Sequence, residues 1–367
     1  MKKTILSLLV WSLTLGLMGG CRGPVGPPGP EGPSGTISGK VYVSNMGEDK
    51  ISVIDIATLT EIKKVEVGAD ASRVEMPHNV ITSNDGRYWY ITLTQAQIDD
   101  LPTGEVWKYR TSDDSFVAKV AVGVFPSHTV LSPDGQRAYV PNYDAFHRDM
   151  NSTVQVIDTE TMTVVKTVGV GAAPHGARIT HDGQYVYIAC TTSDEVAVIS
   201  TSDNELFRLI PIADDPGDPG FPKYQPWQVA ISPDDQYAYV TCLTSGEVRR
   251  IDIRSNVVID SVGVGDLPYQ LEITRDGNYL YVANLGSNDV SVIFAHTMTL
   301  VKTIPVGENA HGVDITPDDR YAFVTCEGNH IDPGSVSVID ILSNTEIASI
   351  TVGVYPIGVS VTPGRGN

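Results

Sequence analysis

Residues 311–326 read HGVDITPDDRYAFVTC, and residues 335–353 read SVSVIDILSNTEIASITVG. Each segment holds two short runs in which apolar and polar residues alternate, and these runs are rich in the β-branched and aromatic side chains that favour strands. A turn at Pro317-Asp318-Asp319 separates the first two runs, because Asp side chains hydrogen-bond to nearby backbone in turns. The stretch therefore predicts a unit of four antiparallel strands.

The same unit recurs along the chain from Gly39 onward. Its first turn returns as Asn84-Asp85-Gly86, Pro133-Asp134-Gly135, His181-Asp182-Gly183, Pro233-Asp234-Asp235 and Arg275-Asp276-Gly277. The leading residues of the first strands align as His78, His128, His175, Trp227, Tyr269, His311 and Ile357, with successive spacings of 50, 47, 52, 42, 42 and 46 residues. Four strands in every ~40–50 residues are typical of a β-propeller.

The two ends of the repeat region complete each other. The region starts with a second, third and fourth strand between Lys40 and Gly68, and it ends with a lone first strand between Gly358 and Thr362. Pairing these ends would leave no free sheet edge between the first and last blades. We therefore predict an all-β fold over residues 38–367: a propeller of seven four-stranded antiparallel blades, closed by a split blade.

The N-terminus has the features of an export signal. Lys2 and Lys3 precede an apolar run that is short for a membrane span, and Met18-Gly19-Gly20-Cys21 follows it. This motif resembles the lipobox of bacterial lipoproteins, although Met18 stands where Leu is usual. The resemblance implies that residues 1–20 are a signal peptide and that Cys21 carries a lipid. Because the next residue is not Asp, it also implies the outer membrane, on its periplasmic side or at the cell surface. An ordinary signal peptide that happens to end at a Cys is the alternative.

Residues 21–37 are expected to form a linker. Four Gly-X-Y triplets between Gly23 and Gly35 follow the collagen period. Four triplets are too few to hold a triple helix, so we expect an extended spacer of ~3.1 Å per residue that holds a monomer off the membrane. Trimerisation through this segment is the alternative.

Several short pieces of the repeat are diagnostic. YVSN at 42–45, YVTC at 239–242, YVAN at 281–284 and FVTC at 323–326 occur together with VSVID and the SPDG or TPDD turns. They closely resemble the YVTN-type repeats of YncE-like β-propeller proteins over nearly all of residues 38–363. The resemblance implies the seven-bladed fold and says little about activity, because one propeller scaffold carries many functions.

Most histidines fall at positions that a propeller places on one face. The start of each first strand and the loop between second and third strands lie on the same side of the ring, which we call the top face. His78, His128, His175 and His311 belong to the first group, and His147 and His330 belong to the second. Imidazole suits transition metals such as Cu, Fe or Zn, and Trp227 and Tyr269 could stack on a flat ligand. Alternatively, these histidines have a structural role, for instance bonding a carbonyl of the neighbouring blade.

The remaining features narrow the function. Cys190, Cys242 and Cys326 occupy one repeat position and are expected to be small buried hydrophobes. A net charge of −19 opposes nucleic-acid binding. No CxxCH motif occurs, so no covalent c-type haem is expected, and no catalytic residue is assigned. We predict an envelope-anchored binding or scaffold propeller with a protein or small-molecule partner on its top face. The alternative is a redox protein that uses the histidines to hold a metal or cofactor.

Overall fold

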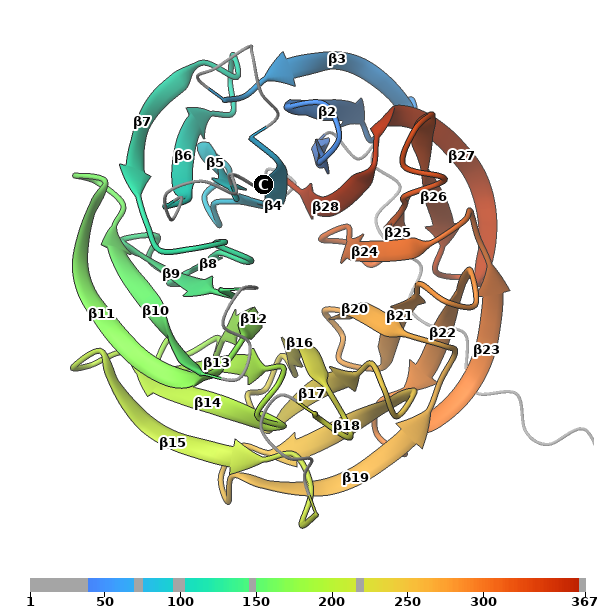
Figure 1. The fold of residues 1–367 in the computed structure, drawn as a ribbon. Helices are drawn as coiled ribbons and strands as arrows, with labels where there is room; N and C mark the ends of the chain where they lie inside the picture. Colours follow the sequence, from blue (N-terminus) through green and yellow to red (C-terminus); the bar gives the residue numbers. More distant parts are fainter. Residues whose placement is uncertain (1–38, 69–74, 95–102, 145–149, 216–220, 363–367) are drawn as a thin grey trace, which may run out of the picture. The chain divides into compact units, whose positions relative to one another are not determined.

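The computed structural model describes residues 39–68, 75–94, 103–144, 150–215 and 221–362. The predicted signal peptide, Cys21, the linker and His147 lie outside these residues. All regular structure in the described part of the chain is β-strand, and the strands form seven four-stranded antiparallel sheets arranged in a ring (Figure 1). The predicted number and type of blades are confirmed.

Each blade runs from an inner strand beside the channel to an outer strand at the rim. Blade 1 is β28 (Pro356–Val361), β1 (Lys40–Asn45), β2 (Lys50–Asp55) and β3 (Thr60–Glu66). Blade 2 is β4 (Pro77–Thr82), β5 (Tyr88–Leu93), β6 (Glu105–Arg110) and β7 (Phe116–Ala121). Blade 3 is β8 (Val130–Leu131), β9 (Arg137–Asn142), β10 (Asn151–Asp158) and β11 (Thr163–Ala172). Blade 4 is β12 (Pro174–Ile179), β13 (Tyr185–Cys190), β14 (Glu195–Ser200) and β15 (Glu205–Pro211).

The other three blades follow the same plan. Blade 5 is β16 (Pro226–Ile231), β17 (Tyr237–Cys242), β18 (Glu247–Asp252) and β19 (Val257–Gly263). Blade 6 is β20 (Pro268–Ile273), β21 (Tyr279–Asn284), β22 (Asp289–Phe294) and β23 (Thr299–Pro305). Blade 7 is β24 (Ala310–Ile315), β25 (Tyr321–Cys326), β26 (Pro333–Asp340) and β27 (Thr345–Val354). None of the residues described forms a helix long and apolar enough to span a membrane.

The ring is closed by the split blade, as predicted. The last strand, β28, pairs antiparallel with β1, so that Val361 lies opposite Val41 and Val359 lies opposite Val43. In addition, β28 contacts β4 and β24, the inner strands of the two neighbouring blades. All six residues of β28 are buried.

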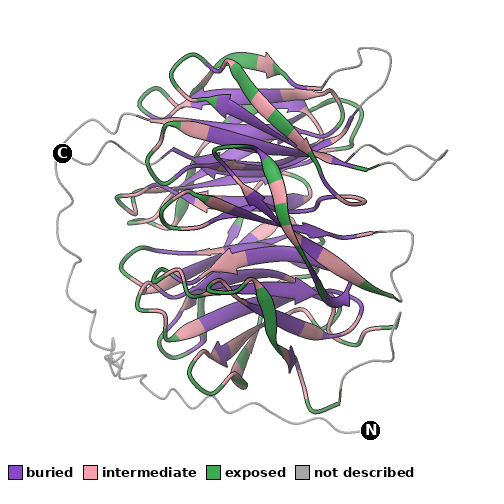
Figure 2. Cartoon of the chain, turned by 90° about the vertical axis from the view of Figure 1, so that its left-hand side faces the viewer, coloured by how far each residue is buried: buried purple, intermediate pink, exposed green. Residues whose placement is uncertain are grey.

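The core is divided among the seven interfaces between blades. Buried apolar residues form seven clusters, and each cluster joins two neighbouring blades. Figure 2 shows buried residues running along the stacked sheets, with exposed residues on turns and outer strands. Blade-to-blade packing of this kind explains why a single blade cannot bury its apolar faces alone.

A tyrosine contact recurs at several of these interfaces. The hydroxyl of Tyr187 donates to Asn256 Oδ1 of the next blade at 3.0 Å. The pairs Tyr139–Asn204 (2.8 Å) and Tyr281–Asn344 (2.5 Å) are built in the same way. The three Asn residues have φ between 52° and 56°, a backbone conformation that Asn tolerates better than most residues. Where the chain instead has Leu59 at this position, the ring opposite is Phe323, which has no hydroxyl.

At the interface between blades 1 and 2, Asp114 takes the place of the Asn. Its carboxylate is 1% exposed and accepts hydrogen bonds from Tyr42 (2.6 Å) and Trp89 Nε1 (2.9 Å). It also forms ion pairs with Lys40 Nζ at 3.0 Å and Lys63 Nζ at 2.6 Å. Burial opposes ionisation, but the hydrogen bonds from Lys63, Tyr42 and Lys40 lower the pKa of Asp114 below its ordinary value. Asp114 therefore joins β1 and β3 of the split blade to blade 2.

The three cysteines of the described residues are buried and free. Each ends a second strand, and burial raises the thiol pKa, to about 12 for Cys190. Their predicted role as small buried hydrophobes is confirmed.

Candidate functional site

The first strands begin with a repeated backbone device that aims side chains at the channel mouth. In all seven blades the residue before the strand has a positive φ, between 50° and 58°, and it precedes Pro or, in blade 7, Ala. The ladder to the second strand is then interrupted, for example between Pro174 and Ala177. An irregularity of this kind bends a strand and redirects the side chains within it. The residue directly after the Pro or Ala is the leading residue of each blade.

The position of the positive-φ residue shows that His128 does not align with the other leading residues. The positive-φ residue of blade 3 is Phe125, and Pro126 follows it, so the leading residue of that blade is Ser127. His128 lies one position further along, where other blades have Asn79 or Gln228. His128 consequently lines the channel below the top face, and its Nε2 accepts a hydrogen bond from Gln228 Nε2 at 3.0 Å. The prediction that His128 leads its strand was wrong. The alignment placed His128 opposite the histidines of other blades, whereas it should have placed Pro126 opposite their prolines.

Aromatic and imidazole rings from different blades converge at the top of the channel. The His78 ring centroid lies 5.6 Å from that of His175, although their blades are not neighbours. His175 stacks on Trp227 at 3.7 Å, and Trp227 lies 4.9 Å from Tyr269. Tyr269 in turn lies 4.7 Å from His311. We call these five residues the top cluster.

Burial keeps two imidazoles of the top cluster, those of His78 and His175, neutral. Desolvation, together with the nearby His311, lowers the pKa of His78 to about 4. Burial also holds the pKa of His175 well below its ordinary value. His78 Nδ1 donates to the carbonyl of Ser127 in the neighbouring blade at 2.7 Å, which is the structural role considered as an alternative above. Among the residues described, His175 Nδ1, His311 Nε2 and Trp227 Nε1 are buried without a hydrogen-bond partner.

His311 and His330 converge on one carboxylate. His311 Nδ1 lies 2.5 Å from Glu327 Oε1, and His330 Nε2 lies 2.6 Å from Glu327 Oε2. Burial favours a neutral Glu327, but the two imidazoles outweigh it and lower the pKa of this carboxyl group. His330 also stacks on Tyr355 at 3.9 Å. Both histidines thus have a carboxylate partner within the same blade.

The predicted metal ligands do not form one set in the structure. His78 and His175 lie together, His128 lies lower in the channel, and His311 and His330 share Glu327. Within the described ranges, no group of three or more His, Cys, Asp or Glu residues is placed to hold a metal ion. His147 lies outside those ranges.

Beneath the top cluster the channel widens into a cavity of about 510 Å³, which we call the channel cavity. Its upper wall carries Asn79, His128, Gln228 and Gln270. It extends down to the turns between first and second strands, which we call the bottom turns and which contribute Asn84, Pro133, His181, Pro233 and Arg275. The top cluster does not line it. The cavity therefore reaches the face opposite the predicted one.

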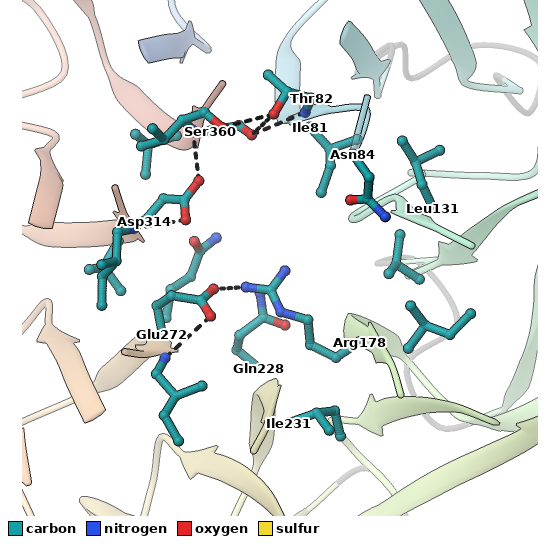
Figure 3. A pocket seen from close by; sticks show the side chains of 18 of the residues that line it. Ile81, Thr82, Asn84, Leu131, Arg178, Gln228, Ile231, Glu272, Asp314 and Ser360 are labelled. Atoms are coloured by element: carbon teal, nitrogen blue, oxygen red, sulfur yellow. Dashed lines mark hydrogen bonds and ion pairs between the residues drawn. The ribbon is translucent and has the colours of Figure 1, made fainter. Parts of the chain in front are cut away.

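Figure 3 shows Arg178, Glu272 and Asp314 projecting into this cavity, which Arg275 also lines from a bottom turn. Arg178 of β12 forms an ion pair with Glu272 of β20, across the intervening blade. Asp314 of β24 accepts the backbone N–H of Val361 at 2.7 Å and that of Ile315 at 2.8 Å. Arg178 lies deep in the ring and still keeps 23% of its side-chain surface accessible, because the channel beside it is hollow.

Sequence reasoning missed these three residues, although a signal was present. Each lies three positions after the leading residue of its blade, where other blades have Ile81, Val130, Ala230 or Ser360. A charge at a position that is otherwise apolar or small was the available clue.

The repeats and the ring agree with a comparison of the sequence with known families. The model of the YNCE-like beta-propeller matches residues 77–320. The chain belongs to the YNCE-like β-propeller family. This confirms the resemblance inferred from the YVTN-type pieces, and the lipoprotein signal remains a prediction.

Several proteins that resemble this YNCE-like β-propeller differ from it widely in sequence. Antigen Lp49 of Leptospira interrogans is 22% identical over 223 residues, which are 57% of this chain and 44% of that relative, so the chain spans less than half of its length. Hydrazine synthase of Kuenenia stuttgartiensis has a TM-score of 0.67 at 22% identity and covers 81% of this chain and 94% of its own. A functionally unknown protein of Desulfotomaculum acetoxidans has a TM-score of 0.72 at 16% identity, covering 89% and 100%. These structures share the fold.

Proposed function

We propose that this YNCE-like β-propeller is a binding protein of the cell envelope, without catalytic activity, that binds its partner on the top face. The partner presents a flat aromatic ring, either as a small molecule or as a side chain of a protein. It stacks on Trp227 and Tyr269, which are partly exposed while the imidazoles around them are buried.

The observation that supports this proposal most is the contact of Trp227 with His175 and Tyr269. Trp227 stacks on His175 at 3.7 Å, and the tilted ring of Tyr269 lies 4.9 Å away, so contacts with both rings fix its orientation before binding. A preorganised aromatic surface loses little conformational entropy when a ring stacks on it. Aromatic contacts of this type contribute about 0.5–1.5 kcal/mol each.

Probes that differ in planarity test this proposal. Indole and p-cresol should bind to the protein in isothermal titration calorimetry, and cyclohexanol, which is similar in size but not planar, should bind much more weakly. Replacing Trp227→Ala should weaken indole binding by about tenfold, because it removes the stacking surface. Phe207→Ala is the matched control, since Phe207 is 53% exposed on the outer strand β15 and should not affect binding. Equal binding of cyclohexanol, or unchanged binding by Trp227→Ala, would exclude the stacking site.

The location in the envelope rests on the sequence around Cys21. We propose that this cysteine carries the lipid and that residues 21–37 space the propeller from an outer membrane. Cells grown with an alkyne-bearing fatty acid should incorporate it into the wild-type protein, and Cys21→Ala should abolish the label and release the protein from the membrane fraction. Cys242→Ala, at a buried site in the propeller, is the control and should keep the label. A label that persists in Cys21→Ala would contradict lipid attachment at this residue.

A further inference from the structure

The channel cavity contains a carboxylate that lacks an ion-pair partner. Arg178 and Glu272 neutralise each other, and Arg275 lines the lower end of the cavity, but Asp314 forms no ion pair with any of the residues described. The other polar residues of the upper wall are amides and His128, whose pKa is held well below its ordinary value by burial. Burial raises the pKa of Asp314, and the backbone N–H groups of Val361 and Ile315 and the charges of Arg178 and Arg275 offset this only in part. A cation beside Asp314 would supply the partner that this carboxyl group lacks.

The cavity also has unused hydrogen-bonding capacity. A carboxylate offers about four acceptor positions, and each oxygen of Asp314 is engaged by one backbone N–H. Gln270 is 8% exposed, lines the cavity, and makes no side-chain hydrogen bond within the described residues. An open cavity with an unpartnered carboxamide and an unpaired carboxylate is suited to a ligand with several polar groups. Its volume of about 510 Å³ lies in the range of small-molecule sites.

The bottom turns around the mouth of the cavity carry more negative than positive side chains. The bottom turns at 83–87, 132–137, 180–184, 232–236, 274–278 and 316–320 contain eight Asp and four Arg residues. Hydrogen bonds within its own turn lower the pKa of Asp134. Asp85 and Asp276 are partly buried, but hydrogen bonds within their turns still lower the pKa of each. These carboxylates remain ionised near neutral pH. A negative rim raises the local concentration of cations at the opening.

We propose that the channel cavity is a second binding site, reached from the bottom face, for a small organic monocation that carries hydroxyl or amide groups. Its ammonium group is held by Asp314, and its other polar groups are held by Gln228 and Gln270. The site is separate from the top-face site proposed above, and neither depends on the other.

Two sets of probes that match in size and differ in charge test this site. Glucosamine, glucose and glucuronate form one set, and ethanolamine, ethylene glycol and glycolate form the other. In calorimetric titrations of the whole protein, at a pH where the amines are charged, the cation of at least one set should bind at least about tenfold more tightly than its neutral and anionic counterparts. If neither set shows a preference for the cation, the proposal is overturned.

Two substitutions in blade 7 test whether Asp314 is the source of the preference for the cation. Asp314→Asn keeps the shape of the side chain and should abolish the preference for the cation. Asp318→Asn removes an exposed carboxylate from the bottom turn of the same blade and should retain it. Unchanged thermal unfolding of both variants separates a lost site from a lost fold. A cation preference that survives in Asp314→Asn would overturn the assignment, and Trp227→Ala should leave this binding unchanged.

Discussion

Deletion of residues 356–367 is expected to unfold the protein or to lower its melting temperature drastically. The deletion removes β28, so β1 loses its inner partner and β4 and β24 lose a neighbour in the ring. Ile357, Val359 and Val361 are at most 7% exposed. Burial of side chains of this size contributes about 1.5–3 kcal/mol each, and their sum is comparable with the total stability of about 5–15 kcal/mol of an ordinary domain.

Truncation at a second point provides the control. A chain that ends at Thr362 keeps every residue of β28 and the bond from the Thr362 backbone N–H to the Lys40 carbonyl at 2.8 Å. It should melt like the full chain when unfolding is followed by circular dichroism. Equal melting temperatures of the two truncated chains would contradict closure of the ring by β28.

Replacement of Asp114 by Ala is expected to lower the free energy of unfolding by about 2–4 kcal/mol at neutral pH. The change leaves the Tyr42 hydroxyl and Trp89 N–H without their acceptor and Lys40 and Lys63 without their counter-ion. The lysine side chains are 25% and 40% exposed, so solvent partly screens their loss and the effect stays below that of a fully buried pair. Denaturation in urea at neutral pH measures the difference. Asp113→Ala removes an adjacent carboxylate that is 58% exposed and should cost less than about 1 kcal/mol.

The same variant should change the pH dependence of stability. The pKa of Asp114 is lower in the folded protein than the ordinary value near ~3.9, so its contribution to stability is present above that value. The contribution is lost as the pH falls through the folded pKa. The wild type should therefore lose more stability than Asp114→Ala between neutral pH and about pH 3. Parallel pH profiles of the two proteins would show that folding does not lower the pKa of Asp114.

Most of the fold could be predicted because its determinants are local. Turns such as Ser132-Pro133-Asp134-Gly135 and strands such as YVYIAC at 185–190 carry their own signals, and their repetition sets the number of blades. The split blade followed from which strands were missing at each end. These inferences need no knowledge of how a side chain is oriented in the ring.

The site was less predictable because it depends on the start of each inner strand. The positive φ at Phe125 and the irregularity after Pro126 decide whether Ser127 or His128 faces the mouth, and neither is visible in a His-to-His alignment. The charges of Arg178, Glu272 and Asp314 are far apart in sequence and meet only when the ring closes. The histidine positions in the sequence indicate the top face, whereas the channel cavity reaches the bottom turns.

The tyrosine contacts between blades bear on how seven similar units find their correct neighbours. Repeats of related sequence risk assembling in the wrong order during folding. Tyr187 meets Asn256 and Phe323 meets Leu59, so the partners at these two interfaces are matched in polarity, whereas Tyr90 and Tyr239 face Met162 and Met298. Placing Tyr187 against Leu59 would bury a hydroxyl group without an acceptor, at a cost of about 1–3 kcal/mol. The contacts at the Tyr187 and Phe323 interfaces therefore help the chain connections to specify which blades become neighbours.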